Sequence, residues 1–238
     1  MSKVAIRCTD ARVSYTVRTH RPLIRGALRG QRPDARVIEA VRGVTFDVAV
    51  GESVGVIGPN GSGKTSLLQA TTGLLPLAGG QVLVRSTPAF LGVQAVLRPH
   101  LTGWRNIRLG LLAQGLNAAE ARGQADGVAE FTGLGDFLDL RMETYSSGMR
   151  ARLHFAVATA LAPKILLIDE ALAVGDREFR NKSAARLDDH RAAAGTVLLV
   201  SHNLAEIRRS CSRVIWLQEG LVIADGPTPD ILAAYEAS

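Results

Sequence analysis

The stretch GPNGSGKTS at residues 58–66 constrains the fold of this 238-residue chain more than any other segment. It follows the apolar run SVGVI and opens a run of helix formers, so it joins a strand to a helix. Its fixed positions, Gly58, Gly63, Lys64 and Thr65, satisfy the pattern G-x-x-x-x-G-K-[ST]. Small residues let backbone N–H groups converge on phosphate oxygens, and the helix N-terminus adds positive potential. The stretch therefore predicts a phosphate-binding loop in an α/β fold.

The loop predicts a role for its side chains as well as for its backbone. Lys64 would reach the β- and γ-phosphates of a nucleotide and belong to the catalytic set, and the Thr65 hydroxyl would bind Mg²⁺. The predicted phosphate contacts are Gly58, Pro59, Asn60, Gly61, Ser62, Gly63, Lys64, Thr65 and Ser66. The alternative is a glycine-rich turn that only connects a strand to a helix.

Apolar runs on both sides of the loop predict the other strands of the sheet. Strand-like runs lie at 3–8, 44–48, 53–57, 82–84, 89–93, 165–168, 196–200 and 213–217, and helical patterning covers 64–74, 103–160 and 227–238. This alternation predicts an α/β fold with a mainly parallel sheet covered by helices. We expect one domain over 1–238, with a core of about 1–93 and 161–238 and an inserted helical subdomain of about 94–160.

Composition narrows the classes of function. With 47% hydrophobic residues the chain can bury a full core, but it has no apolar run of the roughly 18 residues that span a membrane. The N-terminus lacks the apolar segment of a secretory signal. Cys8 and Cys211 are too few for a disulfide framework, so we expect buried thiols in a reducing compartment. The net charge of +6 favours an anionic partner, which could be a nucleotide, a nucleic acid or a membrane surface.

Two later strands end in polar residues that could act on a bound phosphate. KILLIDE places Asp169 and Glu170 at the carboxyl end of a strand, which is the ligand-binding edge of an open α/β sheet. Asp169 suits the outer shell of Mg²⁺, and Glu170 could polarise an attacking water as general base. LLVSHN places His202 at the same edge, where it could hydrogen-bond the γ-phosphate. A solvated acidic turn and a structural histidine are the alternatives.

The stretch TYSSGMR at 144–150 puts small residues ahead of a helix and allows two interpretations. Ser146 could simply cap the helix, because a serine oxygen accepts a hydrogen bond from the first helical turn. The unpaired N–H groups of that turn could instead bind an anion, with Ser147 and Gly148 leaving room for it.

The phosphate loop, the helical lobe, YSSGMR, ILLIDE, ALAVGD and SHN, in this order, resemble the ATP-binding cassette ATPases, the nucleotide-binding subunits of ABC transporters. The resemblance covers essentially the whole chain. It implies a P-loop ATPase with an antiparallel β part beside the parallel core, ATP and Mg²⁺ as cofactors, and a head-to-tail homodimer around two ATP molecules. Ser146 and the Gly148 N–H of one subunit would grip the γ-phosphate held by the other. Tyr145, Ser147 and Met149 replace residues of the family's usual Leu-Ser-Gly-Gly-Gln stretch.

The resemblance adds three residues to the expected site. Gln94 would contact Mg²⁺ and sense the membrane partner, although LGVQAVL departs from the usual aromatic-Pro-Gln context. Asp176 would cross the dimer interface. Tyr15 is the nearest aromatic residue that could stack on adenine, and a core tyrosine is the alternative.

YSSGM, LRPHLTGWRNI and EALAVGD resemble one branch of the family, the exporters of polysaccharides and polyol phosphates such as O-antigen, capsule and teichoic acid. This implies a polytopic membrane permease as partner, a lipid-linked glycan handled through the permease, and a peripheral position on the cytoplasmic face of the inner membrane. An importer or multidrug exporter subunit is the alternative, since few motif letters separate the branches. A soluble cassette acting on ribosomes or DNA is a further one; we expect no nucleic-acid partner, because the chain has one cassette and no coiled-coil insertion.

Residues 18–36 form a basic stretch with two interpretations. Its arginines recur every three or four residues, which would align them on one face of a helix: Arg18, Arg21, Arg25, Arg29, Arg32 and Arg36. Two prolines and two glycines within the stretch oppose a helix, and a solvated basic loop between two strands is the alternative. On the helical interpretation the arginines would face the anionic inner leaflet or the pyrophosphate of the lipid-linked substrate.

Overall fold

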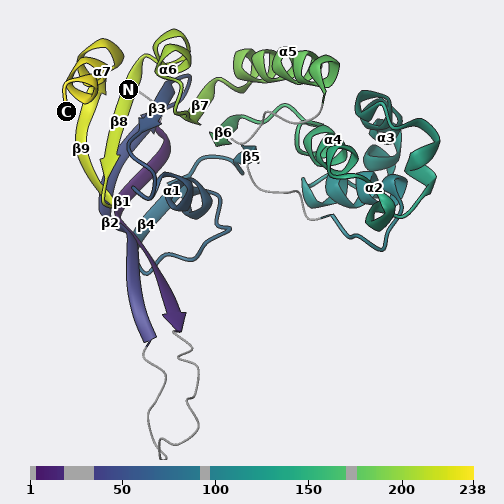
Figure 1. Ribbon diagram of the computed structural model, residues 1–238, viewed down its shortest axis with the longest axis horizontal. Helices are drawn as coiled ribbons and strands as arrows, with labels where there is room; N and C mark the ends of the chain where they lie inside the picture. Colours follow the sequence, from purple (N-terminus) through teal and green to yellow (C-terminus); the bar gives the residue numbers. More distant parts are fainter. Residues whose placement is uncertain (1–3, 19–34, 92–96, 170–175) are drawn as a thin grey trace, which may run out of the picture.

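Two β-sheets form one part of the molecule, and a group of helices lies at the other side (Figure 1). The computed structural model describes residues 4–18, 35–91, 97–169 and 176–238. The strands are β1 (Val4–Arg18), β2 (Ala35–Ala49), β3 (Ser53–Ile57), β4 (Gly79–Val84), β5 (Ala89–Leu91), β6 (Ile165–Asp169), β7 (Thr196–Val200), β8 (Arg213–Gln218) and β9 (Leu221–Pro227). The helices are α1 (Lys64–Thr71), α2 (Gly103–Ala113), α3 (Ala118–Thr132), α4 (Ser147–Ala158), α5 (Arg177–Ala194), α6 (Leu204–Ser210) and α7 (Thr228–Glu236), with short 3₁₀ helices η1 (Gly135–Asp139) and η2 (Met142–Thr144).

The larger sheet has the strand order β5-β6-β7-β3-β8-β9, and all its neighbouring strands are parallel except β8 and β9. β3, β6 and β7 have five residues each, mostly apolar, and are buried over almost their whole length. A parallel strand that is covered on both faces needs such a continuous apolar run. The predicted α/β fold with a mainly parallel sheet is confirmed.

The smaller sheet, β2-β1-β4, is antiparallel. β1 and β2 have 15 residues each, so the short strands predicted at 3–8 and 44–48 are wrong in length. The reason is that outward-facing polar residues such as Arg12 and Ser14 interrupt the apolar run while inward-facing Val13 continues the alternation. A strand with one solvated face keeps this mixed pattern, which a search for apolar runs cuts short.

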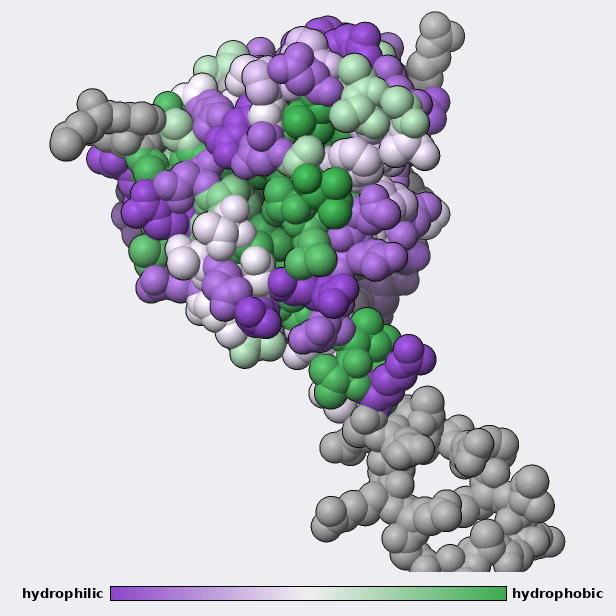
Figure 2. Space-filling model, turned by 90° about the vertical axis from the view of Figure 1, so that its left-hand side faces the viewer, coloured by the Kyte–Doolittle hydropathy of each residue, from purple (hydrophilic) through white to green (hydrophobic). Residues whose placement is uncertain are grey.

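The outer ends of β1 and β2 leave the sheet as a two-stranded arm, residues 14–18 and 35–39 (Figure 1). The arm exposes Val17, Val37 and Ile38, and Figure 2 shows this apolar surface where the arm leaves the body. Arg18 and Arg36 lie in paired strands, so the helical interpretation of the basic stretch does not hold at these two positions. The part of that stretch at 19–34 lies outside the described residues.

β9 is an edge strand that the sequence patterns did not predict. It pairs antiparallel with β8, and its residues alternate between exposed and half-buried positions. The run LVIADGP carries an aspartate, a glycine and a proline, which strands normally avoid. An edge strand tolerates them because one of its sides has no ladder to complete.

Helices α2, α3 and α4 lie together at one side of the molecule, and a separate hydrophobic cluster holds them together (Figure 1). The rings of Phe131 and Phe155 stack at 6.0 Å between centroids, and Phe179 of α5 meets Phe131 edge-on at 5.7 Å. Asn117 and Glu120 form a capping box at the start of α3, which explains why this helix begins there. The boundaries 94–160 given above for a helical subdomain stay a prediction.

Both cysteines are buried, as predicted. Burial raises the pKa of the Cys8 thiol to about 12, so this side chain stays protonated at neutral pH and packs as a small hydrophobe. Among the residues that the structure describes, no helix combines the length and apolar character needed to cross a membrane.

We expect Gly80→Ala to lower the free energy of unfolding by about 2 kcal/mol or more. Gly80 has a φ of +74°, and a Cβ there would lie 2.0 Å from the Asp10 carbonyl oxygen of β1. The matched control is Gly127→Ala in α3, where nothing lies within 4 Å and the alanine should add about 0.5–1 kcal/mol. Urea unfolding followed by circular dichroism measures both. Equal stability of the two variants would contradict the packing described for β1 and β4.

Candidate functional site

The loop between β3 and α1 has the backbone geometry of an anion site. Gly63, which precedes α1, has φ 99° and ψ 4°, and a Cβ there would lie 2.1 Å from the Ala40 carbonyl oxygen. Only glycine fits this position, because it needs both a left-handed backbone and a close approach to β2. No side chain caps the N-terminus of α1, so its first N–H groups are available to a ligand.

Lys64 holds its charge inside the loop. Its side chain is buried, and Nζ donates hydrogen bonds to the carbonyl oxygens of Gly58 and Pro59, both at 2.8 Å. Phosphate oxygens are stronger acceptors than these carbonyls because they are charged. An incoming phosphate can therefore recruit an ammonium group that already lies at the loop.

Thr65 and Asp169 meet across 104 positions of sequence. The Thr65 hydroxyl donates to Asp169 Oδ2 at 2.7 Å, which joins the start of α1 to the end of β6. A hydroxyl and a carboxylate are oxygen ligands of the kind that Mg²⁺ prefers, and Mg²⁺ is commonly held by one or two protein groups plus phosphate and water. The donor set thus fits Mg²⁺. The described residues contain no group of three or more His, Cys, Asp or Glu side chains that could hold a metal by themselves.

His202 follows β7 at the same edge of the sheet. Ser201 donates to Glu206 at 3.0 Å and accepts from the Asn203 N–H at 3.1 Å, while Asn203 caps α6. These bonds shape the turn after β7, and His202 is exposed on it. The structure therefore brings His202 to the edge where β6 and β3 also end.

Tyr15 lies against the phosphate loop although it is 51 residues away in sequence. Its hydroxyl is 3.0 Å from Ser66 Oγ, and its backbone pairs with Ile38 in the arm. The side chain is 37% exposed, so the alternative of a core tyrosine is wrong. The hydroxyl of Tyr15 thus contacts the loop, and stacking of its ring on adenine stays a prediction.

The turn Ser146–Gly148 opens α4, and Ser146 is its cap. Ser146 Oγ accepts from the Met149 N–H at 3.2 Å, which confirms the capping interpretation. A Cβ at Gly148 would have only Ser146 Oγ within 4 Å, at 3.9 Å, so the turn has open space beside it. α4, which Ser146 caps, lies well apart from α1, which follows the phosphate loop (Figure 1).

Asp176 caps α5 and pairs with a residue that the sequence did not single out. It accepts from the Phe179 N–H at 2.9 Å and forms an ion pair with Arg152 of α4. In the sequence, only the position of Arg152 shortly after the YSSGM stretch could have pointed to a role near the site. Of the other predicted site residues, Gln94 and Glu170 lie outside the described residues.

A family model described as ABC transporter matches residues 41–173, more than half of the chain. The chain belongs to the ABC transporter family. It is 36% identical over 197 residues to the teichoic acids export ATP-binding protein TagH of Listeria monocytogenes serotype 4b, covering 83% of this chain and 59% of that protein. It is 40% identical over 211 residues to the O-antigen export system ATP-binding protein RfbB of Myxococcus xanthus, covering 87% and 48%. This chain thus spans about half the length of these relatives.

Solved structures confirm the cassette fold. A dimeric ATP-binding cassette in a post-hydrolysis state with ADP and Pi aligns with a TM-score of 0.69 at 23% identity, over 94% of this chain and 98% of that one. An ATP-binding subunit of an ABC transporter aligns with a TM-score of 0.72 at 24% identity, over 98% and 93%. The resemblance to ABC ATPases and to their polysaccharide-exporting branch, predicted from the motifs, is confirmed by the family match and these relatives.

We expect Thr65→Val to weaken Mg²⁺-dependent binding of ATP about tenfold or more, because the variant loses the oxygen that meets Asp169. Thr65→Ser is the matched control, since it keeps the hydroxyl and should bind as the wild type does. Titration with a fluorescent ATP analogue, with and without Mg²⁺, measures the effect. Equal affinity of the valine and serine variants in Mg²⁺ would contradict the role given to this hydroxyl.

Proposed function

We propose that this chain is the ATP-binding and ATP-hydrolysing subunit of an exporter that moves a lipid-linked polysaccharide or polyol phosphate across the cytoplasmic membrane. The observation that carries the proposal is the meeting of Thr65, Asp169 and the Lys64 loop at one sheet edge. The relatives, which are teichoic acid and O-antigen export ATP-binding proteins, support export as the process.

The loop residues bind and orient the triphosphate. The α1 N-terminus and Lys64 would neutralise the β- and γ-phosphates, and Tyr15 would hold the adenine beside Ser66. Thr65 and Asp169, with Gln94, would hold Mg²⁺, which offsets negative charge on the phosphates during the reaction. The predicted contacts at 58–66 would then share the anion among several backbone N–H groups.

Two side chains would act near the γ-phosphate, one on the proton of the attacking water and one on the phosphate itself. Glu170 follows Asp169 directly and would accept the proton of the attacking water as general base. His202 at the end of β7 would hydrogen-bond the γ-phosphate, because the turn around Ser201 presents it at this edge. Lys64 would stabilise the negative charge that develops on the β- and γ-phosphates during hydrolysis.

The site would be completed by a second copy of the chain. Ser146 and Gly148 have open space beside them and lie apart from their own phosphate loop, which supports a partner's ATP as their ligand. Asp176 would stand at the same interface. ATP would then hold two copies together, and hydrolysis would release them.

The partner in the membrane would be a polytopic permease, with this subunit on its cytoplasmic side. The described residues supply no membrane-spanning helix, so the passage of the glycan would belong to the permease. Cycles of closure and release in the homodimer would drive the permease between its states.

We expect Glu170→Gln to lower ATP turnover about 10²–10⁴-fold while ATP binding is kept, because the amide cannot accept the proton. An ATP-bound dimer should accumulate, which light scattering detects beside phosphate release. In cells that lack the gene, lipid-linked glycan should accumulate at the inner face of the membrane, and the wild-type chain, but not Glu170→Gln, should restore export.

The matched control is Glu236→Gln, which makes the same chemical change at an exposed surface pair with Arg208. It should hydrolyse ATP and restore export like the wild type. Near-normal ATP turnover by Glu170→Gln would contradict the role of Glu170 as general base. Normal glycan export in cells without the gene would contradict the role of the chain in transport.

A further inference from the structure

Tyr145 stands directly before the turn that caps α4, at the position where the family's usual stretch has leucine. Its side chain is 3% exposed and belongs to the hydrophobic cluster of α2, α3 and α4. Burial raises the pKa of the phenol, so the hydroxyl is a proton donor throughout the neutral range. A leucine could fill the same apolar space but could not donate a hydrogen bond.

The Tyr145 hydroxyl donates a hydrogen bond and fits into space left by a neighbouring glycine. It donates to the Phe137 carbonyl oxygen of η1 at 2.6 Å, a short bond for two neutral groups. Gly103, the first residue of α2, leaves room for it, because a Cβ there would lie 2.5 Å from the hydroxyl oxygen. The phenol therefore ties η1 and the start of α2 to the residue before Ser146.

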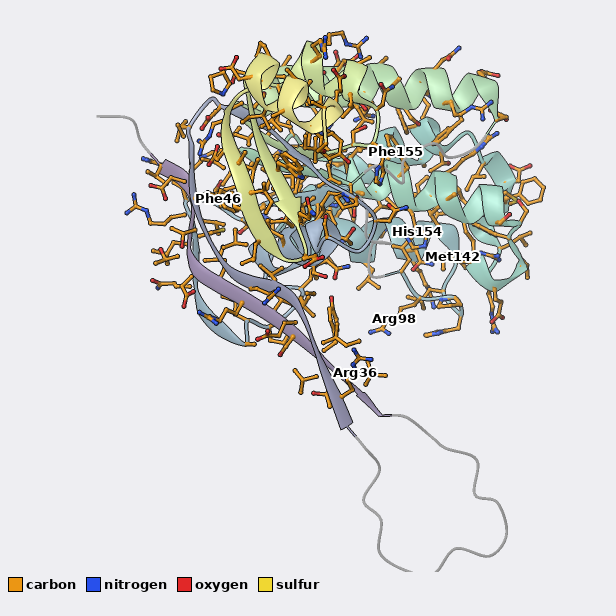
Figure 3. All side chains as sticks on the ribbon, turned by 60° about the vertical axis from the view of Figure 1, so that its left-hand side comes forward. Arg36, Phe46, Arg98, Met142, His154 and Phe155 are labelled. Carbon is orange, nitrogen blue, oxygen red and sulfur yellow. The ribbon has the colours of Figure 1, made fainter. Side chains whose placement is uncertain are left out.

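The backbone of Tyr145 is fixed as well. Its N–H donates to the Met142 carbonyl oxygen at 3.0 Å, and its own carbonyl oxygen accepts from Arg150 Nη1 at 2.5 Å. Met142, labelled in Figure 3, lies on the helical side of the molecule. Since Ser146 is the next residue, the direction in which its oxygen points follows from how Tyr145 is held.

We propose that the Tyr145 hydroxyl is a positioning group for the turn Ser146–Gly148, which it holds against η1 in the geometry that contacts the second subunit's ATP. The proposal rests on the proposed function, because it assumes that this turn acts on a partner's nucleotide. Tyr145 touches no nucleotide itself. It acts through Ser146, whose geometry is required only when two copies close on ATP.

The test is Tyr145→Phe, which removes one oxygen and leaves the ring in place. Loss of one neutral hydrogen bond should lower kcat about 3- to 10-fold and weaken ATP-driven dimerisation to the same extent. Binding of a fluorescent ATP analogue to the monomer should be unchanged, because the phosphate loop is on another part of the chain. A purely structural role would instead lower the melting temperature and leave kcat per folded molecule unchanged.

Two further variants test whether the loss of kcat comes from the missing hydrogen-bond donor. Tyr235→Phe is the matched control, since Tyr235 of α7 packs on Trp216 of β8, away from the site, and should keep wild-type kcat. Incorporation of 4-aminophenylalanine at position 145 keeps a donor and should restore most of the kcat lost in the Phe variant. All values are divided by the folded fraction, measured by circular dichroism at the assay temperature.

The outcomes separate this proposal from the proposed function. A wild-type chain without ATPase activity would overturn the proposed function. An active wild type with an equally active Tyr145→Phe variant would overturn only the role of the hydroxyl. Equal losses in the Phe and 4-aminophenylalanine variants would also overturn it, because the donated proton would then be irrelevant.

Discussion

The register of the parallel strands β6, β7 and β3 decides where the polar groups of the site stand. Val200 at the end of β7 pairs with Asp169 on one side and with Val56 on the other, so the three strands end level with one another. This alignment brings the Thr65 hydroxyl to 2.7 Å from the Asp169 carboxylate. A slip of one residue in β6 would turn Asp169 to the opposite face of the sheet and remove the site.

A second constraint is that the chain holds the two halves of the proposed site apart. The phosphate loop belongs to the sheet, whereas Ser146 and Gly148 belong to the helices α2, α3 and α4, which have their own hydrophobic cluster (Figure 1). Separate hydrophobic clusters in the sheet part and in the helical part allow each half to be rigid on its own. In our proposal this separation leaves a bound nucleotide open on one side. Completion of the site by a second copy follows from this separation in our proposal.

The local parts of the fold could be predicted from the sequence, and so could the meeting of Thr65 and Asp169, since the motifs assign both to one Mg²⁺. Most other contacts between distant residues could not be predicted. The loop at 58–66 and the buried strands β6 and β7 are contiguous patterns whose composition follows from backbone sterics and burial. The long arm and β9 escaped prediction because a half-solvated strand mixes polar residues into its apolar alternation. The Tyr145–Phe137 bond depends on how helices pack, which no spacing in the chain reveals.

The most direct test of the shared site is cross-linking between two different chains, one with Asn60→Cys and one with Ser147→Cys, after removal of Cys8 and Cys211. Asn60 is exposed on the phosphate loop and Ser147 lies at the start of α4. Added to the mixture, a short bifunctional maleimide should give a covalent dimer when ATP and Mg²⁺ are present and none when they are absent. Failure to form this mixed dimer under conditions in which ATP is bound would contradict a site shared between two copies.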